Sequence, residues 1–363
     1  MDEGRVASLR PVCLEDYLPY TGPQTIEQIK TLAKNLEGKK IQHLNTAAVG
    51  GGVAEILKSL VPLMQQVGLD AKWQVMKVNP AFCEVTKRFH NVFHGVPLSV
   101  TQEMFSLYRE GIESNLNLID PQADYVVLHD QQPLGLAQMR PQHPGQWIWY
   151  CHVDPVQVGQ CLWDFLKQFA GQCDAAIYHL PQYAKKVCPR EYSIPPAIDP
   201  LSEKNREVTA EESRAVLERL GIDQGLPMVL QVSRFDRLKN HIGVVEAFRS
   251  LYRKIPCQLV LAGGGADDDP EGDRVYNEVL LAARGHPRIK VLLLPPVSNL
   301  EINVLQRSAA VVVQNSVREG FGLTVSEALW KERPVVASPV GGISRQILDG
   351  QTGLVARSSE ELA

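Results

Sequence analysis

The sequence predicts an α/β protein of two Rossmann-like domains that face each other across a cleft, and three observations support this. Its 363 residues exceed the usual size of one hydrophobic core and fit two domains. Short apolar runs alternate with helical patterns along the chain, which is typical of doubly wound parallel sheets. Pro195 and Pro196 interrupt that alternation and indicate a linker. We therefore predict an N-terminal domain at 1–196 and a C-terminal domain at 197–363.

The first half begins with a helix over 25–36, a strand and a glycine run at 50–52. A helix over 53–67 follows, and Pro62 is expected to kink it or to shift its last turn. A strand, a glycine turn and a helix form the usual start of a Rossmann-like domain. This glycine run is not G-x-G-x-x-G, however, which disfavours a dinucleotide dehydrogenase. The predicted strands of this half are 41–46, 71–78, 125–128, 147–151 and 175–179. Two of the strands in the first half end in His next to, or close to, Asp, and ligands of such sheets gather at the carboxyl ends of strands.

The second half repeats the alternation of strands and helices after the double proline. The strands predicted for the second half are 228–232, 258–262, 290–294, 309–314 and 335–337, with helices at 210–220, 243–254, 275–283, 300–308 and 323–331.

Composition describes a globular protein and excludes several classes. The formal net charge of −4 gives no reason to expect nucleic acid or an anionic membrane as a partner. No apolar run reaches the length of about 18 residues that a membrane span needs, so the cytoplasm is the expected location. Seven scattered cysteines without a C-x-x-C pair argue against a disulfide framework or a structural zinc site.

The stretch 315–328 is the most informative part of the sequence. Glu319 and Glu327 stand eight residues apart across a Gly-Phe-Gly turn that opens an apolar helix. A glycine turn at a helix N-terminus directs unpaired N–H groups at an anion, while carboxylates accept hydrogen bonds from sugar hydroxyls. Two alternatives stay open: residues 324–327 also form a capping box that uses Glu327, and Glu319 can be a solvated loop residue.

A second motif follows the strand 228–232, where Arg234 and Lys239 lie five residues apart on one loop. A diphosphate needs one or two fixed cations, which this pair can supply, although a solvated basic loop is the alternative. The run Asp267-Asp268-Asp269 matches the D-x-D pattern of a metal site. An acidic turn is the alternative. We expect no bound metal and no cofactor.

Taken together, the E-x7-E stretch from Glu319 to Glu327 and an S-R-x-x-x-x-K segment with Arg234 and Lys239 resemble the family-4 retaining glycosyltransferases. The resemblance implies a GT-B type fold and a nucleotide-sugar donor, with Glu319 on the sugar and Glu327 on the ribose. The implied donor-binding residues are Gly51, Gly52, Arg234, Lys239, Glu319, Phe321, Gly322, Leu323 and Glu327. The implied acceptor residues are His129, Asp130 and His152, and the implied catalytic residues are His152, Asp130, Arg234, Lys239 and Glu319.

Strings in the N-terminal half, such as 129–133 and 195–205, look like those of trehalose synthases of the glycosyltransferring type. That resemblance implies transfer of glucose from a nucleoside diphosphate glucose to free glucose. Gln131 departs from it, because Pro is expected there. Alternatives are a trehalose phosphorylase, a transferase with another acceptor and a non-catalytic sugar-nucleotide binder. We leave a homodimer open, and the end of the chain at Ala363, where a helix begins, suggests a fragment.

Overall fold

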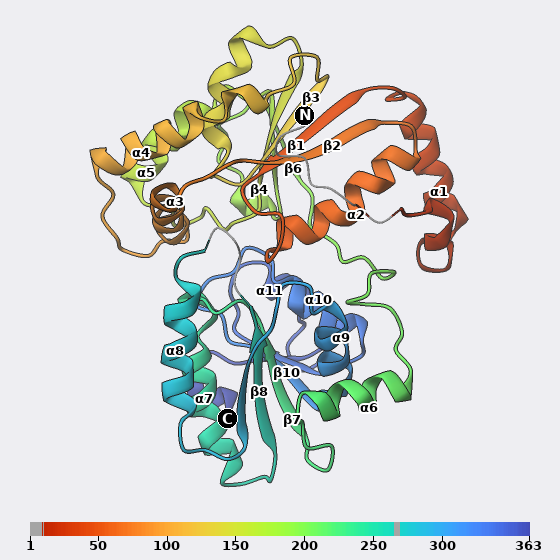
Figure 1. Cartoon of the computed structure of the whole chain (residues 1–363), viewed down its shortest axis with the longest axis vertical. Coiled ribbons are helices and arrows are strands. Elements are labelled where there is room, and N and C mark those ends of the chain that lie inside the picture. The colour runs from red at the N-terminus through yellow and green to blue at the C-terminus, as the bar shows by residue number, and fades with distance from the viewer. Residues whose placement is uncertain (1–8, 10, 265–268) are drawn as a thin grey trace. The chain divides into compact units, whose positions relative to one another are not determined.

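The computed structural model describes residue 9 and residues 11–264 and 269–363. The chain divides into two compact units, Met1–Pro196 and Ala197–Ala363, each built around one sheet (Figure 1). All pairs of neighbouring strands in both sheets are parallel. Parallel sheets need helices on both faces, which explains why the strands are short, apolar and separated by helical segments.

The sheet of the first unit has the strand order β2-β1-β3-β4-β5-β6. Five of its strands match the predicted runs within a few residues. The sixth was not predicted, since its residues are mostly exposed and polar, as suits an edge strand. The strands are β1 Lys40–Asn45, β2 Asp70–Val75, β3 Tyr125–His129, β4 Gln146–Cys151, β5 Ala175–Tyr178 and β6 Arg190–Ser193.

In Figure 1, α1 and α2 lie on one side of this sheet and α3, α4 and α5 on the other. The first helix differs from the prediction: it begins at Leu18, and Gly22, at φ 75°, interrupts it before Pro23. Pro62 lies inside α2 and does not end it before Gln66. The helices are α1 Leu18–Lys34, α2 Gly52–Gln66, α3 Pro80–Phe93, α4 Gln102–Glu113 and α5 Gln160–Ala170, with 3-10 helices at Leu14–Tyr17, Leu116–Leu118, Leu134–Gln142 and Pro181–Tyr183.

The second unit has the strand order β12-β11-β10-β7-β8-β9. Its central strand β7 is buried at every residue, as expected of a strand covered on both faces. The two-residue strand β12 was not predicted. The strands are β7 Met228–Val232, β8 Gln258–Gly263, β9 Ile289–Leu293, β10 Val311–Gln314, β11 Val335–Ala337 and β12 Leu354–Val355.

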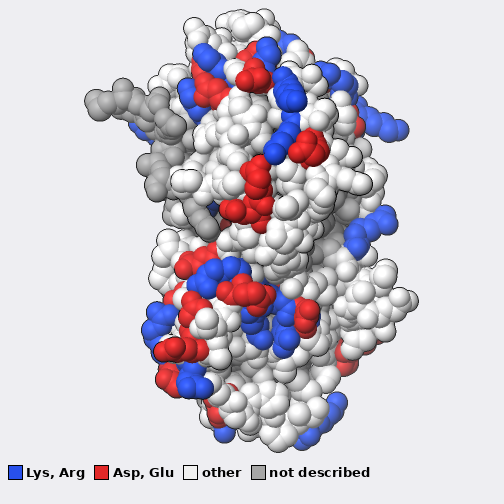
Figure 2. Space-filling view, turned by 90° about the vertical axis from the view of Figure 1, so that its right-hand side faces the viewer, with Lys and Arg blue, Asp and Glu red and all other residues white. Residues whose placement is uncertain are grey.

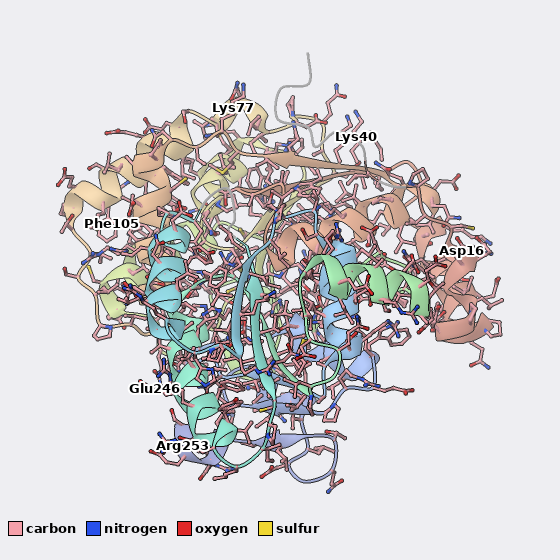
Figure 3. The ribbon with its side chains drawn as sticks, turned by 60° about the horizontal axis from the view of Figure 1, so that its bottom comes forward. Asp16, Lys40, Lys77, Phe105, Glu246 and Arg253 are labelled. Atoms are coloured by element: carbon pink, nitrogen blue, oxygen red, sulfur yellow. The ribbon has the colours of Figure 1, made fainter. Side chains whose placement is uncertain are left out.

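Helices α7 and α8 cover one side of the second sheet, and α6, α9 and α10 cover the other (Figure 1). Glu246 and Arg253 mark the course of α7 in Figure 3, and Phe105 marks α4 in the first unit. The helices are α6 Ala210–Arg219, α7 His241–Tyr252, α8 Gly272–Ala283, α9 Asn299–Ser308, α10 Leu323–Trp330, α11 Ile343–Gln346 and α12 Ser359–Leu362, with a 3-10 helix at Arg237–Lys239.

Each unit has its own core. Large aromatic side chains, among them Trp73, Trp147 and Trp149, are fully buried in the first unit, whereas aliphatic residues dominate the second. On the face that Figure 2 shows, acidic and basic side chains are interspersed. Within the described part of the chain, no helix has both the length and the apolarity needed to cross a bilayer.

Candidate active site

The loop after β7 carries the first two predicted donor residues. Asp236 shapes this loop, since its carboxylate accepts the Leu238 N–H at 2.7 Å and so starts the 3-10 turn that holds Lys239. Arg234 is partly exposed, and its guanidinium contacts the Asp269 carboxylate at 2.9 Å. The loop therefore presents two cations at the carboxyl end of the central strand, the edge where ligands of parallel sheets bind.

Lys239 and Glu319 meet although they are far apart in sequence. The Lys239 Nζ lies 2.5 Å from Oε2 of Glu319, and both side chains are largely buried, at 16% and 12% exposure. Gln231 supports the lysine from β7 by donating to its backbone carbonyl at 2.9 Å. An ammonium group and a carboxylate therefore lie side by side, because β7 and β10 are neighbours in the sheet.

Glu319 is not a solvated loop residue. Besides Lys239, its Oε2 accepts a hydrogen bond from the Ser316 hydroxyl at 3.1 Å and lies 3.4 Å from the Gln314 amide nitrogen. Ser338, which follows β11, holds the loop by donating to the Ser316 carbonyl at 2.5 Å. Three neighbouring loops thus fix the position of this carboxylate.

The glycine turn before α10 has the geometry that the sequence predicts. Gly322 is the N-cap in the left-handed region, at φ 90°, and no side chain of the described residues caps the helix. The first N–H groups of a helix lack intrahelical partners, so Leu323 and the next residue direct theirs outward. At Gly342, a Cβ would come within 2.5 Å of the Phe321 Cα, so glycine is required for the two backbones to pack.

The capping-box alternative for Glu327 is wrong. The cap position is Gly322, so Thr324 lies inside the helix and Glu327 is in its second turn. Glu327 is instead buried, at 1% exposure. Its Oε2 accepts from the Gln306 amide at 3.0 Å, and its Oε1 lies 3.4 Å from the Lys204 Nζ. These contacts hold the Glu327 carboxylate in the second turn of α10. They account for its buried position without a capping role.

The other donor prediction concerns the glycine run before α2. Gly50 has φ 82°, which favours glycine, and Gly51 is the extended N-cap of α2. A Cβ built on Gly51 would meet no atom of the described residues within 4 Å. The backbone of Gly51 is thus open to close approach by a ligand at a helix N-terminus, and Gly52, the first residue of α2, is exposed.

The three predicted acceptor residues lie together at the carboxyl ends of β3 and β4. Asp130, in the left-handed region at φ 68°, accepts the His152 N–H on its carboxylate at 2.6 Å. The Nδ1 of His129 lies 2.9 Å from the Nε2 of His152. Two further buried histidines, His43 and His179, contact these rings. Neither was predicted from sequence to belong to the site.

Gln131 occupies a buried position beside this group. Its side chain is fully buried, and within the described part of the chain neither its amide oxygen nor its amide nitrogen has a hydrogen-bond partner. Its backbone carbonyl accepts the Tyr108 hydroxyl at 2.9 Å, which anchors the loop. The departure from proline at this position therefore places an unpaired amide in the interior.

The acidic run was weighed as a metal site. Asp267 and Asp268 lie outside the described residues, and Asp269 pairs with Arg234. The described residues contain no group of three or more His, Cys, Asp or Glu arranged to hold a metal ion. The ion pair of Asp269 gives this carboxylate a role in holding Arg234.

Known proteins resemble both halves of the chain. Residues 43–185 match the family model of the trehalose synthase N-terminal domain, and residues 213–363 match that of glycosyl transferases group 1. The trehalose synthase of Thermococcus litoralis is 44% identical over 350 residues, which cover 95% of this chain and 85% of that protein. The trehalose phosphorylase of Pleurotus pulmonarius is 28% identical, and the match covers 94% of this chain and 53% of that protein.

Solved structures resemble the fold. A UDP-forming trehalose-phosphate synthase from Burkholderia xenovorans, in complex with glucose-6-phosphate, has a TM-score of 0.70 at 14% identity, with 90% of each chain covered. Sucrose-phosphate synthase from Thermosynechococcus elongatus has a TM-score of 0.67 at 20% identity, with 89% of this chain and 88% of that chain covered. The predicted α/β fold of GT-B type is thereby confirmed.

Proposed function

The chain belongs to the trehalose synthase family of glycosyltransferases, and we propose that it makes trehalose from a nucleoside diphosphate glucose and free glucose, with retention. Family membership makes it a hexosyltransferase. The observation that carries the proposal is the contact of Lys239 with Glu319 at the carboxyl ends of β7 and β10. A donor sugar diphosphate presents both an anion and hydroxyl groups, and this contact offers one partner for each.

In the proposed donor site, Arg234 and Lys239 bind the diphosphate and stabilise it as the leaving group. The helix start at Phe321, Gly322 and Leu323 adds N–H donors and the dipole of α10. Glu319 accepts the hydroxyls of the donor sugar. A further donor contact comes from Glu327, which binds the ribose.

In the proposed acceptor site, Asp130 holds the accepting glucose, and His152 and His129 lie beside it. The bond between the anomeric carbon and the leaving phosphate oxygen breaks. The acceptor oxygen then bonds the same face of that carbon, and its proton passes to the leaving phosphate. Orientation of the acceptor and stabilisation of the phosphate supply the rate acceleration, so the step needs no covalent sugar–enzyme intermediate. Since protein cations neutralise the diphosphate, we expect no divalent metal to be required.

The test is product formation from defined donors. The protein is incubated with glucose and, separately, UDP-, ADP- or GDP-glucose, with EDTA present, and a non-reducing disaccharide is sought by chromatography and NMR. Trehalose from at least one nucleotide sugar is the expected result. Trehalose made only from glucose 1-phosphate would instead identify a phosphorylase, the activity named for the Pleurotus pulmonarius relative. Transfer only to another sugar would refute the product.

A further inference from the structure

Four buried histidines of the first unit form one continuous chain of ring contacts, which we call the histidine chain. The Nδ1 of His43 lies 3.0 Å from the Nε2 of His129. The Nδ1 of His129 lies 2.9 Å from the Nε2 of His152, and the Nδ1 of His152 lies 3.0 Å from the Nε2 of His179. Every contact thus joins Nδ1 of one ring to Nε2 of the next.

Strand register explains the first two links. His43 of β1 pairs with Val127 of β3, so His129 lies two residues closer to the carboxyl edge. His129 in turn pairs with Tyr150 of β4, so His152 lies two residues further again. Side chains alternate between faces with a period of two, so each step of two residues keeps the ring on the same face.

The last link runs across the sheet without a further step. Cys151 of β4 pairs with Tyr178 of β5, so the residues that follow them, His152 and His179, lie level at the carboxyl edge. The histidine chain therefore starts inside the sheet at β1 and ends at the edge where β4 and β5 finish. It passes through both histidines that are predicted to serve the acceptor.

The rings of His43, His129 and His152 have lowered pKa values and are neutral at pH 7. Burial lowers the pKa of His43 to about 4, and burial together with neighbouring imidazoles holds the pKa of His129 and His152 well below the usual range. A neutral imidazole has one N–H donor and one acceptor nitrogen. With three ring-to-ring bonds in series, the hydrogen must sit on the same kind of nitrogen in every ring.

Either direction of donation satisfies all three contacts. With hydrogen on Nδ1, each ring donates toward His179, and with hydrogen on Nε2, each ring donates toward His43. In both cases the ring of His152 has one N–H and one acceptor nitrogen, and its two histidine neighbours use both. The contacts therefore hold the ring of His152 whichever direction the hydrogens take.

The titratable groups around the rings are compatible with this state. Tyr150 stacks on His152 with ring centroids 4.1 Å apart, its hydroxyl lies 3.2 Å from the Ile194 carbonyl, and burial raises its pKa to about 12. The Asp130 carboxylate accepts the backbone N–H of His152 at 2.6 Å. That contact is to the backbone of His152, while its two ring nitrogens contact His129 and His179.

We propose that His43 and His179 are positioning residues that, with His129, hold the ring of His152 in one orientation and in the same tautomer as its histidine neighbours. While the chain is intact, both ring nitrogens of His152 are bonded to other histidines, so this ring does not act as the base for the acceptor hydroxyl. The inference rests on the proposed function only for the place of His152 beside the acceptor. The tautomer itself is a property of the fold.

The first experiment reads the tautomers directly. Protein labelled with nitrogen-15 in histidine is studied by long-range proton–nitrogen correlation, and ring signals are assigned by single substitutions. At pH 7 we expect His43, His129, His152 and His179 to be neutral and to carry hydrogen on the same kind of nitrogen, Nδ1 in all four rings or Nε2 in all four. A charged ring at His152, or different tautomers at His129 and His152, would overturn the inference. This result does not depend on any activity, so it stands apart from the test for trehalose.

The second experiment asks whether His43 acts through the chain. His43→Leu removes the ring nitrogen that contacts His129 at 3.0 Å, whereas His43→Asn keeps an amide near the Nδ1 position. We expect His43→Leu to move the ring signals of His152 and to lower kcat of the transfer reaction about three- to tenfold with little change in KM. His43→Asn should restore both readouts.

The matched control is His90→Leu, which removes a half-buried histidine of α3 outside the chain. Should His43→Leu destabilise the fold, His179→Gln and His179→Leu repeat the comparison from the other end, because the Gln amide lies near the Nε2 position. The proposal fails if the leucine variants keep the ring signals of His152 and the kcat of the wild type, or if His90→Leu changes both equally.

Discussion

Replacing Lys239 by methionine should weaken nucleotide binding while leaving the fold intact. The change keeps the apolar stem and removes the ammonium group that lies 2.5 Å from Glu319. One charge-assisted hydrogen bond to a phosphate contributes about 1.5–3 kcal/mol. The dissociation constant of a nucleoside diphosphate should therefore rise about 10- to 150-fold.

Titration calorimetry with UDP, ADP and GDP measures this effect. Lys254→Met is the matched control, since Lys254 is an exposed lysine of the same unit just beyond α7. Thermal unfolding of each variant shows whether the loss of affinity reflects loss of structure. Equal affinity of Lys239→Met and Lys254→Met for every nucleotide would refute the assignment of Lys239 to the diphosphate.

Glu319→Gln separates the two halves of the pair. This carboxylate is predicted to contact the donor sugar and not the diphosphate, so the variant should bind nucleoside diphosphate at least as well as wild type. Its kcat with the nucleotide sugar should fall, because the amide is a weaker acceptor than a carboxylate for sugar hydroxyls. Normal turnover in Glu319→Gln would contradict the sugar contact even if the prediction for Lys239 holds.

Four further outcomes are expected. Glu327→Gln should cost about 1–3 kcal/mol of stability and weaken nucleotide binding, since it breaks the buried contact with Lys204 at 3.4 Å; chemical denaturation and calorimetry measure the two effects. Gly322→Ala should lower the free energy of unfolding by about 1–2 kcal/mol, because the residue has φ 90°. Gln131→Met should raise the melting temperature by removing a buried unpaired amide, and a lower melting temperature would show that the amide is satisfied. Stability should fall as the pH is lowered from 6.5 to about 4, because the unfolded state binds a proton at His43 that the folded state excludes; His43→Asn should flatten this dependence in denaturation curves at several pH values.

The strands of both sheets were largely predictable from sequence because strands covered on both faces are continuous apolar runs. β7 lies where the apolar run 228–232 placed it. The edge strand β6 was not predicted because its residues are polar and mostly exposed, so its sequence pattern does not differ from that of a loop. The start of α1 was missed because Gly22 and Pro23 look like a break, whereas the chain resumes the helix after them.

For the candidate site, local motifs were informative and strand register was not accessible. The loop pair Arg234 and Lys239 and the glycine turn at Gly322 are visible as spacings in sequence. Nothing local indicates that Lys239 reaches Glu319, since that contact follows from the adjacency of β7 and β10. His43 looks like an ordinary strand residue, and only the offset of two residues between neighbouring strands joins it to His129.

The ion pairs of Arg234 with Asp269 and of Lys239 with Glu319 give the site its own internal counter-anions. At the proposed donor site, an incoming diphosphate would therefore exchange anions at these cations and would not meet bare positive charge. Simple ions such as phosphate or sulfate would gain little from such an exchange, because they would replace a carboxylate without adding other contacts. The exchange would also free the Glu319 carboxylate from its lysine as the nucleotide arrives. The proposed acceptor of the sugar hydroxyls would thus become available when a sugar attached to that nucleotide is present to use it.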